Sequence, residues 1–197
     1  MTANIFRSQR LVYRAVEDSP EEEAFLHRIT TDIEGFANSN VGLSKPQNKE
    51  STKGWRKYLT EKTLISAIFC VTSLTDPEST PEPIGVVTLT GTSPHNAHHR
   101  NANISVDVLP SHQRKGYGSE AIQWVLQWGF QMAGLHRIGI ESFEYNEGAG
   151  RLYERLGFTL EGRKRDYLWF NGEWHDMLGF SMLEDEWREL QKVQKTD

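Results

Sequence analysis

The sequence predicts a mixed α/β fold in which helices cover both faces of one central, mostly antiparallel sheet. Three observations support this prediction. Residues 103–109 alternate apolar and polar side chains, which is typical of a half-buried strand. Residues 116–133 follow with the apolar stripe of a long amphipathic helix. Asn171-Gly172 then joins two strand-like stretches, and this dipeptide is a strong hairpin signal because both turn residues must adopt positive φ.

Local signals predict the remaining elements. Ser19-Pro20 followed by two glutamates is typical of a helix start. The segment 30–48 is rich in Gly, Asn and Ser and predicts a loop, as do the three prolines and three acids of residues 76–83. Further strands are predicted at residues 11–16, 64–74, 84–90, 137–143, 158–170 and 173–183, and further helices at 49–61 and 148–156. Hairpins at both ends of this order exclude a doubly wound parallel sheet.

Length and composition predict a single soluble domain that spans residues 1–197. The chain has no apolar run long enough for a signal peptide or a membrane span, so we expect a cytoplasmic protein without a membrane partner. Its single cysteine, Cys70, cannot form an internal disulfide. The net charge of −5 lacks the basic footprint of a nucleic-acid-binding protein. A monomer and a homodimer both remain open.

The candidate chemistry is concentrated between the strand 103–109 and the helix that follows it. A strand-to-helix turn directs several free backbone N–H groups the same way, beside the positive end of the helix dipole. Two glycines allow close approach of a ligand and two cations add positive charge, which predicts a pyrophosphate cradle, the alternative being a simple tight turn. The residues of this loop are Gln113, Arg114, Lys115, Gly116, Tyr117, Gly118 and Ser119.

Two familiar nucleotide sites do not fit this loop. The phosphate loop GxxxxGK[ST] is absent from the chain. A dinucleotide fingerprint has a third glycine, and Ala121 stands near that position here. The fingerprint also follows the first strand of its fold, whereas this loop follows a later strand. Another nucleotide-binding protein that uses the same loop remains an alternative.

Two sequence blocks carry a resemblance to a known family. Residues 113–118 match the Q/R-x-x-G-x-G/A signature of the GNAT acetyltransferases, and residues 146–158 match their N-x-x-A-x-x-L-Y-x-x-x-G-F block. Residues 161–163 and 171–176 resemble the branch of ribosomal-protein N-terminal and spermidine acetyltransferases. The resemblance is firm over residues 84–187 and is only topological before them.

The resemblance implies a GNAT fold in which the strands 103–109 and 137–143 splay apart around the pantetheine arm of acetyl-CoA. Backbone groups of Val106, Asp107 and Val108 would pair with this arm, and the amides of the loop would hold the pyrophosphate. Asn146 would hydrogen-bond the arm, although its alternative role is the N-cap of the next helix. Tyr153 would be the catalytic general acid that protonates the leaving thiolate, the alternative being a core aromatic.

The resemblance also exposes a departure from the family pattern. The family's usual general base is a glutamate on the strand before the loop, and that position is Asn103 here. An amide has no useful basicity near neutral pH. Asp107, Glu141, Glu34 and His112 are candidate replacements, and a chain of waters is another.

The implied reaction is transfer of the acetyl group to an amine acceptor, which would be a small-molecule amine, a polyamine or a protein N-terminus. The acceptor would contact the segment 30–48 and the hairpin at Asn171. The alternative function is an acyl-CoA-binding regulator without catalysis, which Asn103 keeps open. No metal is expected; three histidines in one turn could bind zinc, but no carboxylate or thiol lies near them in sequence. These histidines are His95, His98 and His99.

Overall fold

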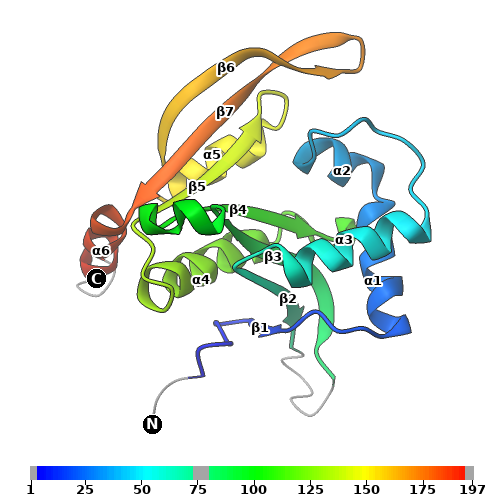
Figure 1. The fold of residues 1–197 in the computed structure, drawn as a ribbon, viewed down its shortest axis with the longest axis horizontal. Helices are drawn as coiled ribbons and strands as arrows, with labels where there is room; N and C mark the ends of the chain where they lie inside the picture. The colour runs from blue at the N-terminus through cyan, green and yellow to red at the C-terminus, as the bar shows by residue number, and fades with distance from the viewer. Residues whose placement is uncertain (1–3, 73–79, 194–197) are drawn as a thin grey trace.

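One seven-stranded sheet organises the chain (Figure 1). The computed structural model describes residues 4–72 and 80–193. The strands are β1 (Leu11–Arg14), β2 (Ile65–Val71), β3 (Glu82–Gly91), β4 (Asn101–Val108), β5 (Arg137–Phe143), β6 (Thr159–Phe170) and β7 (Glu173–Leu183), in the spatial order β1-β2-β3-β4-β5-β7-β6. Neighbouring strands are antiparallel except for the parallel pair β4–β5. The predicted mixed, mostly antiparallel sheet is confirmed.

Helices cover both faces of this sheet, with α1 and α3 on one face and α4 on the other (Figure 1). The helices are α1 (Pro20–Thr30), α2 (Ile33–Ser39), α3 (Lys49–Glu61), α4 (Tyr117–Gln131), α5 (Glu147–Arg155) and α6 (Glu184–Val193), with the 3₁₀ helices η1 (Pro94–His99) and η2 (Pro110–His112). None of the helices within the described ranges is long and apolar enough to span a bilayer.

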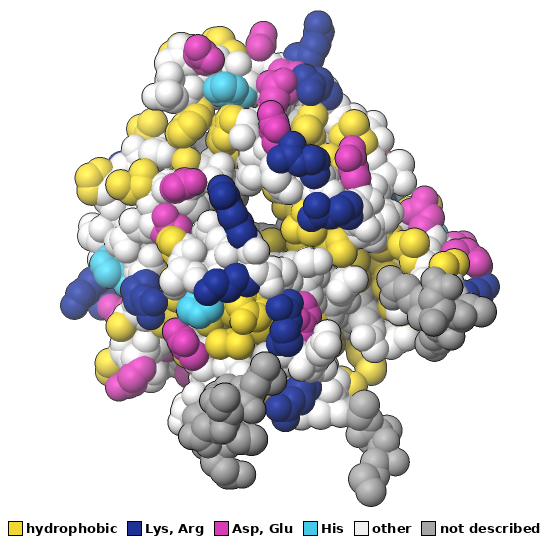
Figure 2. Space-filling model, turned by 180° about the vertical axis from the view of Figure 1, so that it is seen from behind, with side chains coloured by type: hydrophobic (Ala, Val, Ile, Leu, Met, Phe, Trp, Pro, Cys, Tyr) yellow, Lys and Arg dark blue, Asp and Glu magenta, His cyan; other side chains and the backbone are white. Residues whose placement is uncertain are grey.

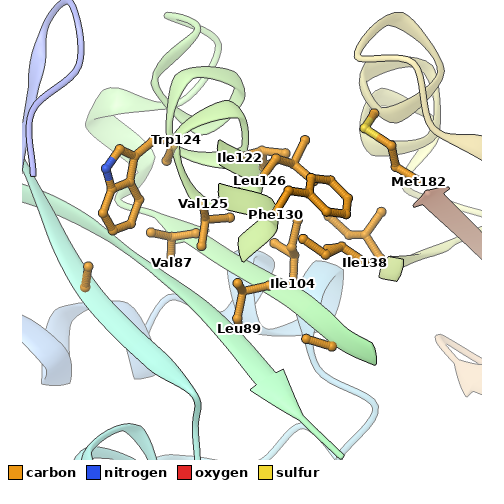
Figure 3. Close-up of a cluster of buried hydrophobic side chains, with 14 of the residues drawn as sticks. Val87, Leu89, Ile104, Ile122, Trp124, Val125, Leu126, Phe130, Ile138 and Met182 are labelled. Carbon is orange, nitrogen blue, oxygen red and sulfur yellow. The ribbon is translucent and has the colours of Figure 1, made fainter. Parts of the chain in front are cut away.

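The alternation of side chains along β2 divides the apolar residues between two cores. Ala67 and Phe69 pack into the larger core beneath α4, whereas Ile68 and Cys70 pack against α1 and α3. Figure 3 shows the apolar face of α4 lying on side chains of β3, β4 and β5. Trp124 of α4 is buried and stacks on Tyr13 with 3.8 Å between ring centroids. This packing fixes α4, and therefore the loop before it, against the sheet.

Several local predictions are confirmed. Ser19 caps α1, since its side chain accepts a hydrogen bond from Glu22 N at 3.1 Å. Asn171 and Gly172 have φ values of 52° and 87°, as the tight hairpin between β6 and β7 requires.

Two sequence predictions need correction, and one helix was missed. The segment 30–48 is not all loop, because it contains α2. The helix α6 was not predicted. Its buried Trp187 packs on Phe130, with 5.5 Å between the ring centroids. The predicted loop 76–83 ends inside β3, which begins at Glu82, while residues 76–79 lie outside the described part.

Candidate functional site

The parallel strands β4 and β5 pair over only a short stretch. Residues 101–103 of β4 lie opposite residues 137–139 of β5, and beyond them the two strands continue to Val108 and Phe143 without pairing to each other. Each strand keeps its other neighbour, β3 or β7. The two edges that face the gap therefore lack a strand partner, and their peptide groups can pair with an extended amide-containing ligand. The splayed middle strands are confirmed.

The loop 113–119 lies at the open end of this gap. Arg114 and Gly116 adopt left-handed conformations with φ of 58° and 82°, and Gly116 is the N-cap of α4. Gln113 Nε2 donates to Val108 O at 2.9 Å and ties the loop to the end of β4. The first N–H groups of a helix have no partner within the helix and lie at its positive end. The loop thus has the donors that a pyrophosphate cradle needs.

An open cleft of about 1690 Å³ collects most of the predicted site residues. Its lining includes Val106, Asp107, Val108, Gln113, Arg114, Gly116, Gly118, Ser119, Asn146 and Tyr153. Lys115 and Tyr117 do not line it. Lys115 Nζ donates to Ser111 O at 2.8 Å, and the ring of Tyr117 packs against the larger core. The ammonium group of Lys115 therefore bonds to the backbone just before the loop and does not line the cleft.

The helix α2 bridges the two diverging strands. Its hydrogen bonds run from Tyr145 Oη to Ala37 O (2.7 Å), from Asn146 Nδ2 to Asn38 O (3.3 Å) and from Ser39 Oγ to Asp107 Oδ1 (2.9 Å). The first two join α2 to the segment after β5, and the third joins it to β4. The helix α2 forms a wall of the cleft, whereas the sequence predicts a loop over the segment 30–48.

Asn146 is the N-cap of α5. Its Oδ1 accepts a hydrogen bond from Ala149 N at 3.2 Å, while its Nδ2 donates to Asn38 O. The alternative role of Asn146 that the sequence offers, the N-cap of α5, is therefore confirmed. Because a carboxamide carries two N–H donors, one of them remains for a ligand in the cleft.

Tyr153 is the one buried residue of α5, with 7% of its surface exposed. Its ring meets Phe180 edge to face at 5.7 Å. Burial raises the pKa of the Tyr153 hydroxyl to about 12, and the nearby charge of Asp107 adds to the shift. The phenol therefore stays protonated at neutral pH, as a proton donor must.

Asn103 is the last residue of β4 that pairs with β5, and the two strands separate beyond it. Its side chain covers Gly139 of β5, so a Cβ at Gly139 would overlap Asn103 Oδ1. Asn103 lines the cleft, yet its carboxamide cannot accept a proton at neutral pH.

The candidate replacements for the base differ in their surroundings. Glu141 is exposed and forms an ion pair with Lys164 at 3.1 Å. Glu34 is exposed on α2. His112 Nδ1 lies 2.9 Å from Ser111 Oγ, in the turn before the loop. All three line the cleft.

Asp107 is half-buried on β4 beyond the point where the strands separate. Burial raises the pKa of its carboxyl; the hydrogen bond from Ser39 opposes this shift, and the nearby charge of Asp32 adds to it. A carboxylate with a raised pKa is a better proton acceptor near neutral pH. Among the candidates, Asp107 therefore combines a raised pKa with a charge that acts on Tyr153.

Charges are unevenly distributed along the cleft. Acids come from α2 and from the two splayed strands, whereas cations come from the loop and from α5. The acids are Asp32, Glu34, Asp107 and Glu141, the cations are Arg114, Arg151 and Arg155, and Glu147 pairs with Arg151 at 2.7 Å. Figure 2 shows a face with a hollow near its middle and Lys and Arg side chains around it. An anionic ligand fits the cationic side and a cationic one fits the acidic side.

Thr88 also lines the cleft and was not found from the sequence. Thr88 Oγ1 on β3 is buried and has no hydrogen-bond partner within the described residues. A buried hydroxyl without a partner is uncommon and marks a place where a ligand or water can bind.

The three clustered histidines lie on η1 at the surface. His98 and His99 contact each other with 3.9 Å between ring centroids. Across residues 4–72 and 80–193, no group of three or more His, Cys, Asp or Glu side chains is arranged to hold a metal ion.

Comparisons with known proteins agree with this geometry. A family model described as an acetyltransferase (GNAT) domain matches residues 10–159. The chain therefore belongs to the GNAT acetyltransferase family, whose members use acetyl-CoA.

Relatives of known sequence match a part of the chain. An uncharacterized N-acetyltransferase of Bacillus subtilis, YoaA, is 40% identical over 85 residues, which are 43% of this chain and 48% of that protein. The spermidine N(1)-acetyltransferase of Vibrio cholerae is 30% identical over 89 residues, which are 45% of this chain and 51% of that protein. The chain thus matches about half the length of these relatives.

Solved structures match most of the fold. A GNAT acetyltransferase from Bacillus anthracis has a TM-score of 0.74 at 21% identity, covering 91% of this chain and 98% of that one. The spermidine N-acetyltransferase of Vibrio cholerae, solved in complex with CoA and spermine, has a TM-score of 0.73 at 23% identity with the same coverage. At these identities the likeness shows the fold alone.

Proposed function

We propose that this chain is an N-acetyltransferase that moves the acetyl group of acetyl-CoA onto a primary amine. The observation that carries the proposal is the cleft, in which an unpaired strand edge, the free amides at the start of α4 and a buried tyrosine meet. The pantetheine arm would pair with the backbone of Val106, Asp107 and Val108, and Asn146 would donate to it. The pyrophosphate would lie on the amides of the loop 113–119.

In the proposed reaction, a neutral amine attacks the thioester carbonyl directly. Asp107 accepts the proton that the amine nitrogen loses as the C–N bond forms. As the C–S bond breaks, Tyr153 donates its phenolic proton to the sulfur. The proton on Asp107 then passes to the phenolate oxygen of Tyr153 and restores the phenol. The roles suit the positions, because Asp107 contacts α2 on the acceptor side and Tyr153 comes from α5 on the other.

A cationic amine is the acceptor class that the cleft favours. The charge of Asp32 acts on Asp107, and Glu34 lines the same cleft, so this side carries negative charge that attracts an ammonium group and raises its local concentration. Acetylation of spermidine by the matching Vibrio cholerae relative supports testing polyamines first. Short peptides remain in the test, because another relative is named a putative ribosomal N-acetyltransferase.

The experiment is a thiol-release assay with acetyl-CoA over polyamines, amino sugars and short peptides. Turnover with at least one amine, absent without it, supports the proposal. Tight CoA binding with no turnover on any acceptor would instead support the regulator, which the amide at Asn103 keeps in consideration.

A further inference from the structure

The segment before β1 lies against the phosphate loop, although more than 100 residues of sequence separate them. Arg10 Nη1 donates to Lys115 O at 2.9 Å, a contact that spans 105 positions. The guanidinium carbon of Arg10 lies 4.6 Å from the centroid of the Tyr117 ring. Arg10 Nη2 is 3.2 Å from the point that a Cβ on Gly116 would occupy. One arginine therefore contacts three consecutive residues of the loop.

Glu120, in the first turn of α4, holds this arginine in place. Its carboxylate accepts hydrogen bonds from Ser8 Oγ at 2.6 Å, from Arg10 N at 2.7 Å and from Arg10 Nε at 2.7 Å. Burial alone would raise the pKa of Glu120, but the hydrogen bonds from Ser8 and Arg10 outweigh it and lower the pKa. The carboxylate is thus ionised near neutral pH, and it neutralises the guanidinium charge. Arg10 therefore acts on the loop through geometry more than through net charge.

The peptide unit between Lys115 and Gly116 connects this contact to the cleft. Because a peptide is planar and trans, its carbonyl and its N–H point in opposite directions, and the described residues contain no cis bond. The carbonyl of Lys115 points to Arg10, which does not line the cleft, so the N–H of Gly116 points away from Arg10. Gly116 lines the cleft, and its N–H makes no hydrogen bond within the described part of the chain.

We propose that Arg10, held by Glu120, is a positioning residue for the pyrophosphate of CoA. It fixes the Lys115–Gly116 peptide in the left-handed turn, so that the free N–H of Gly116 faces the phosphate before the ligand arrives. Such preorganisation improves affinity because the loop does not have to be ordered on binding. The inference rests on the proposed function, since it presumes that this loop binds CoA.

A positioning role for Arg10 predicts different effects on the binding of two ligands, whereas a purely structural role would affect both equally. CoA carries the pyrophosphate, whereas pantetheine has the same arm and thiol without it. In Arg10→Ala, the Kd for CoA should rise by roughly tenfold, because the loop would then have to be ordered on binding. The affinity for pantetheine should stay at the wild-type value. Arg10→Lys should behave like Arg10→Ala, because a single ammonium cannot bond Glu120 and Lys115 O in the fork geometry of a guanidinium.

The experiment measures the binding of CoA and pantetheine to the full chain by calorimetry, with Arg188→Ala as the control. Arg188 pairs with Glu184 at 2.6 Å on α6, so this change removes a surface ion pair and should leave both affinities unchanged. Glu120→Gln provides a second test if Arg10→Ala does not fold, and it should weaken CoA binding selectively as well.

The outcomes distinguish the proposed function from the positioning role of Arg10. Failure of the wild type to bind CoA would overturn the proposed function itself. Wild-type CoA affinity in Arg10→Ala, or an equal loss of CoA and pantetheine binding, would overturn the positioning role alone. A loss confined to CoA supports it.

Discussion

The two halves of the cleft are built from different parts of the chain. In the proposed function, the nucleotide half would consist of the free edge of β4, the loop 113–119 and the start of α5, which offer mainly backbone groups. The acceptor half would consist of α2 and the side chains of Thr88, Asn103 and Asp107, which line the cleft from β3 and β4. A ligand common to a whole family can be held by the backbone of a shared fold. An acceptor that varies within the family requires side chains that can vary.

The largest effect is expected in the nucleotide half. Acetyl-CoA should raise the Tm of the wild type, because a ligand that binds only the native state stabilises it by mass action. In Gly118→Glu this shift should be abolished, since a carboxylate side chain would occupy the place of the pyrophosphate. Thermal unfolding with and without acetyl-CoA measures both.

Gly118→Ala is the matched control for that variant. A Cβ on Gly118 would meet Val108 Cγ2 at 3.5 Å, an ordinary contact, so this protein should fold and keep most of its CoA affinity. Unchanged CoA binding in Gly118→Glu would contradict the assignment of the loop as the cradle.

The nucleotide half was largely predictable because its signals are local. A strand, two glycines and an amphipathic helix follow one another within residues 103–133, and each has a clear sequence pattern. The acceptor half was not predictable in the same way. Gly35, Asn38 and Ser39 are poor helix formers, and α2 is held by hydrogen bonds to Tyr145, Asn146 and Asp107, more than 60 residues away.

The same difference explains two further omissions. Arg10 contacts the phosphate loop across 105 positions, so no local pattern indicates its role. In α6, Trp187 is the one buried residue among many charged side chains, and its contact with Phe130 becomes visible only in the folded protein. Tertiary contacts decide such elements, and a single sequence does not show them.

The second prediction tests the chemistry at the boundary between the two halves. Tyr153→Phe removes only the hydroxyl, so kcat should fall by roughly 10²-fold or more while the affinity for acetyl-CoA barely changes. Pre-steady-state and steady-state rates on one acceptor, together with a CoA titration, measure the two effects. Wild-type turnover when chemistry limits the rate would reduce Tyr153 to a packing residue.

A smaller effect is expected for Asp107→Asn in the acceptor half. If Asp107 is the base, kcat/KM at neutral pH should fall by at least about tenfold, with bound water replacing the carboxylate in part. The wild-type profile should lose activity as acid protonates Asp107, at a pH above the usual range of aspartate because burial raises its pKa. The variant should lack this acidic limb. A limb that persists in Asp107→Asn and disappears in Glu141→Gln would transfer the role to Glu141.

The smallest effect concerns the cost of keeping a carboxylate in the acceptor half. Since the pKa of Asp107 is raised in the folded state, its contribution to stability is most favourable below the pKa of the unfolded chain, about 3.9, and declines as pH rises through the folded value. At pH 7 the folded protein therefore carries a partly dehydrated charge. Asn in its place can still accept the hydrogen bond from Ser39, without that charge.

Asp107→Asn should therefore raise the Tm at pH 7, by about 2–4 °C for each 1 kcal/mol relieved, and change it little near pH 3.5. Thermal scans at the two pH values measure this difference. Glu141→Gln is the control, because Glu141 is exposed and paired with Lys164, so its replacement should give no gain. A variant that is more stable at neutral pH yet slower in turnover would show that the acceptor half keeps Asp107 for chemistry at a cost in stability. A lower Tm at pH 7 would mean that the Ser39–Asp107 contact stabilises the fold, and the carboxylate would then be structural.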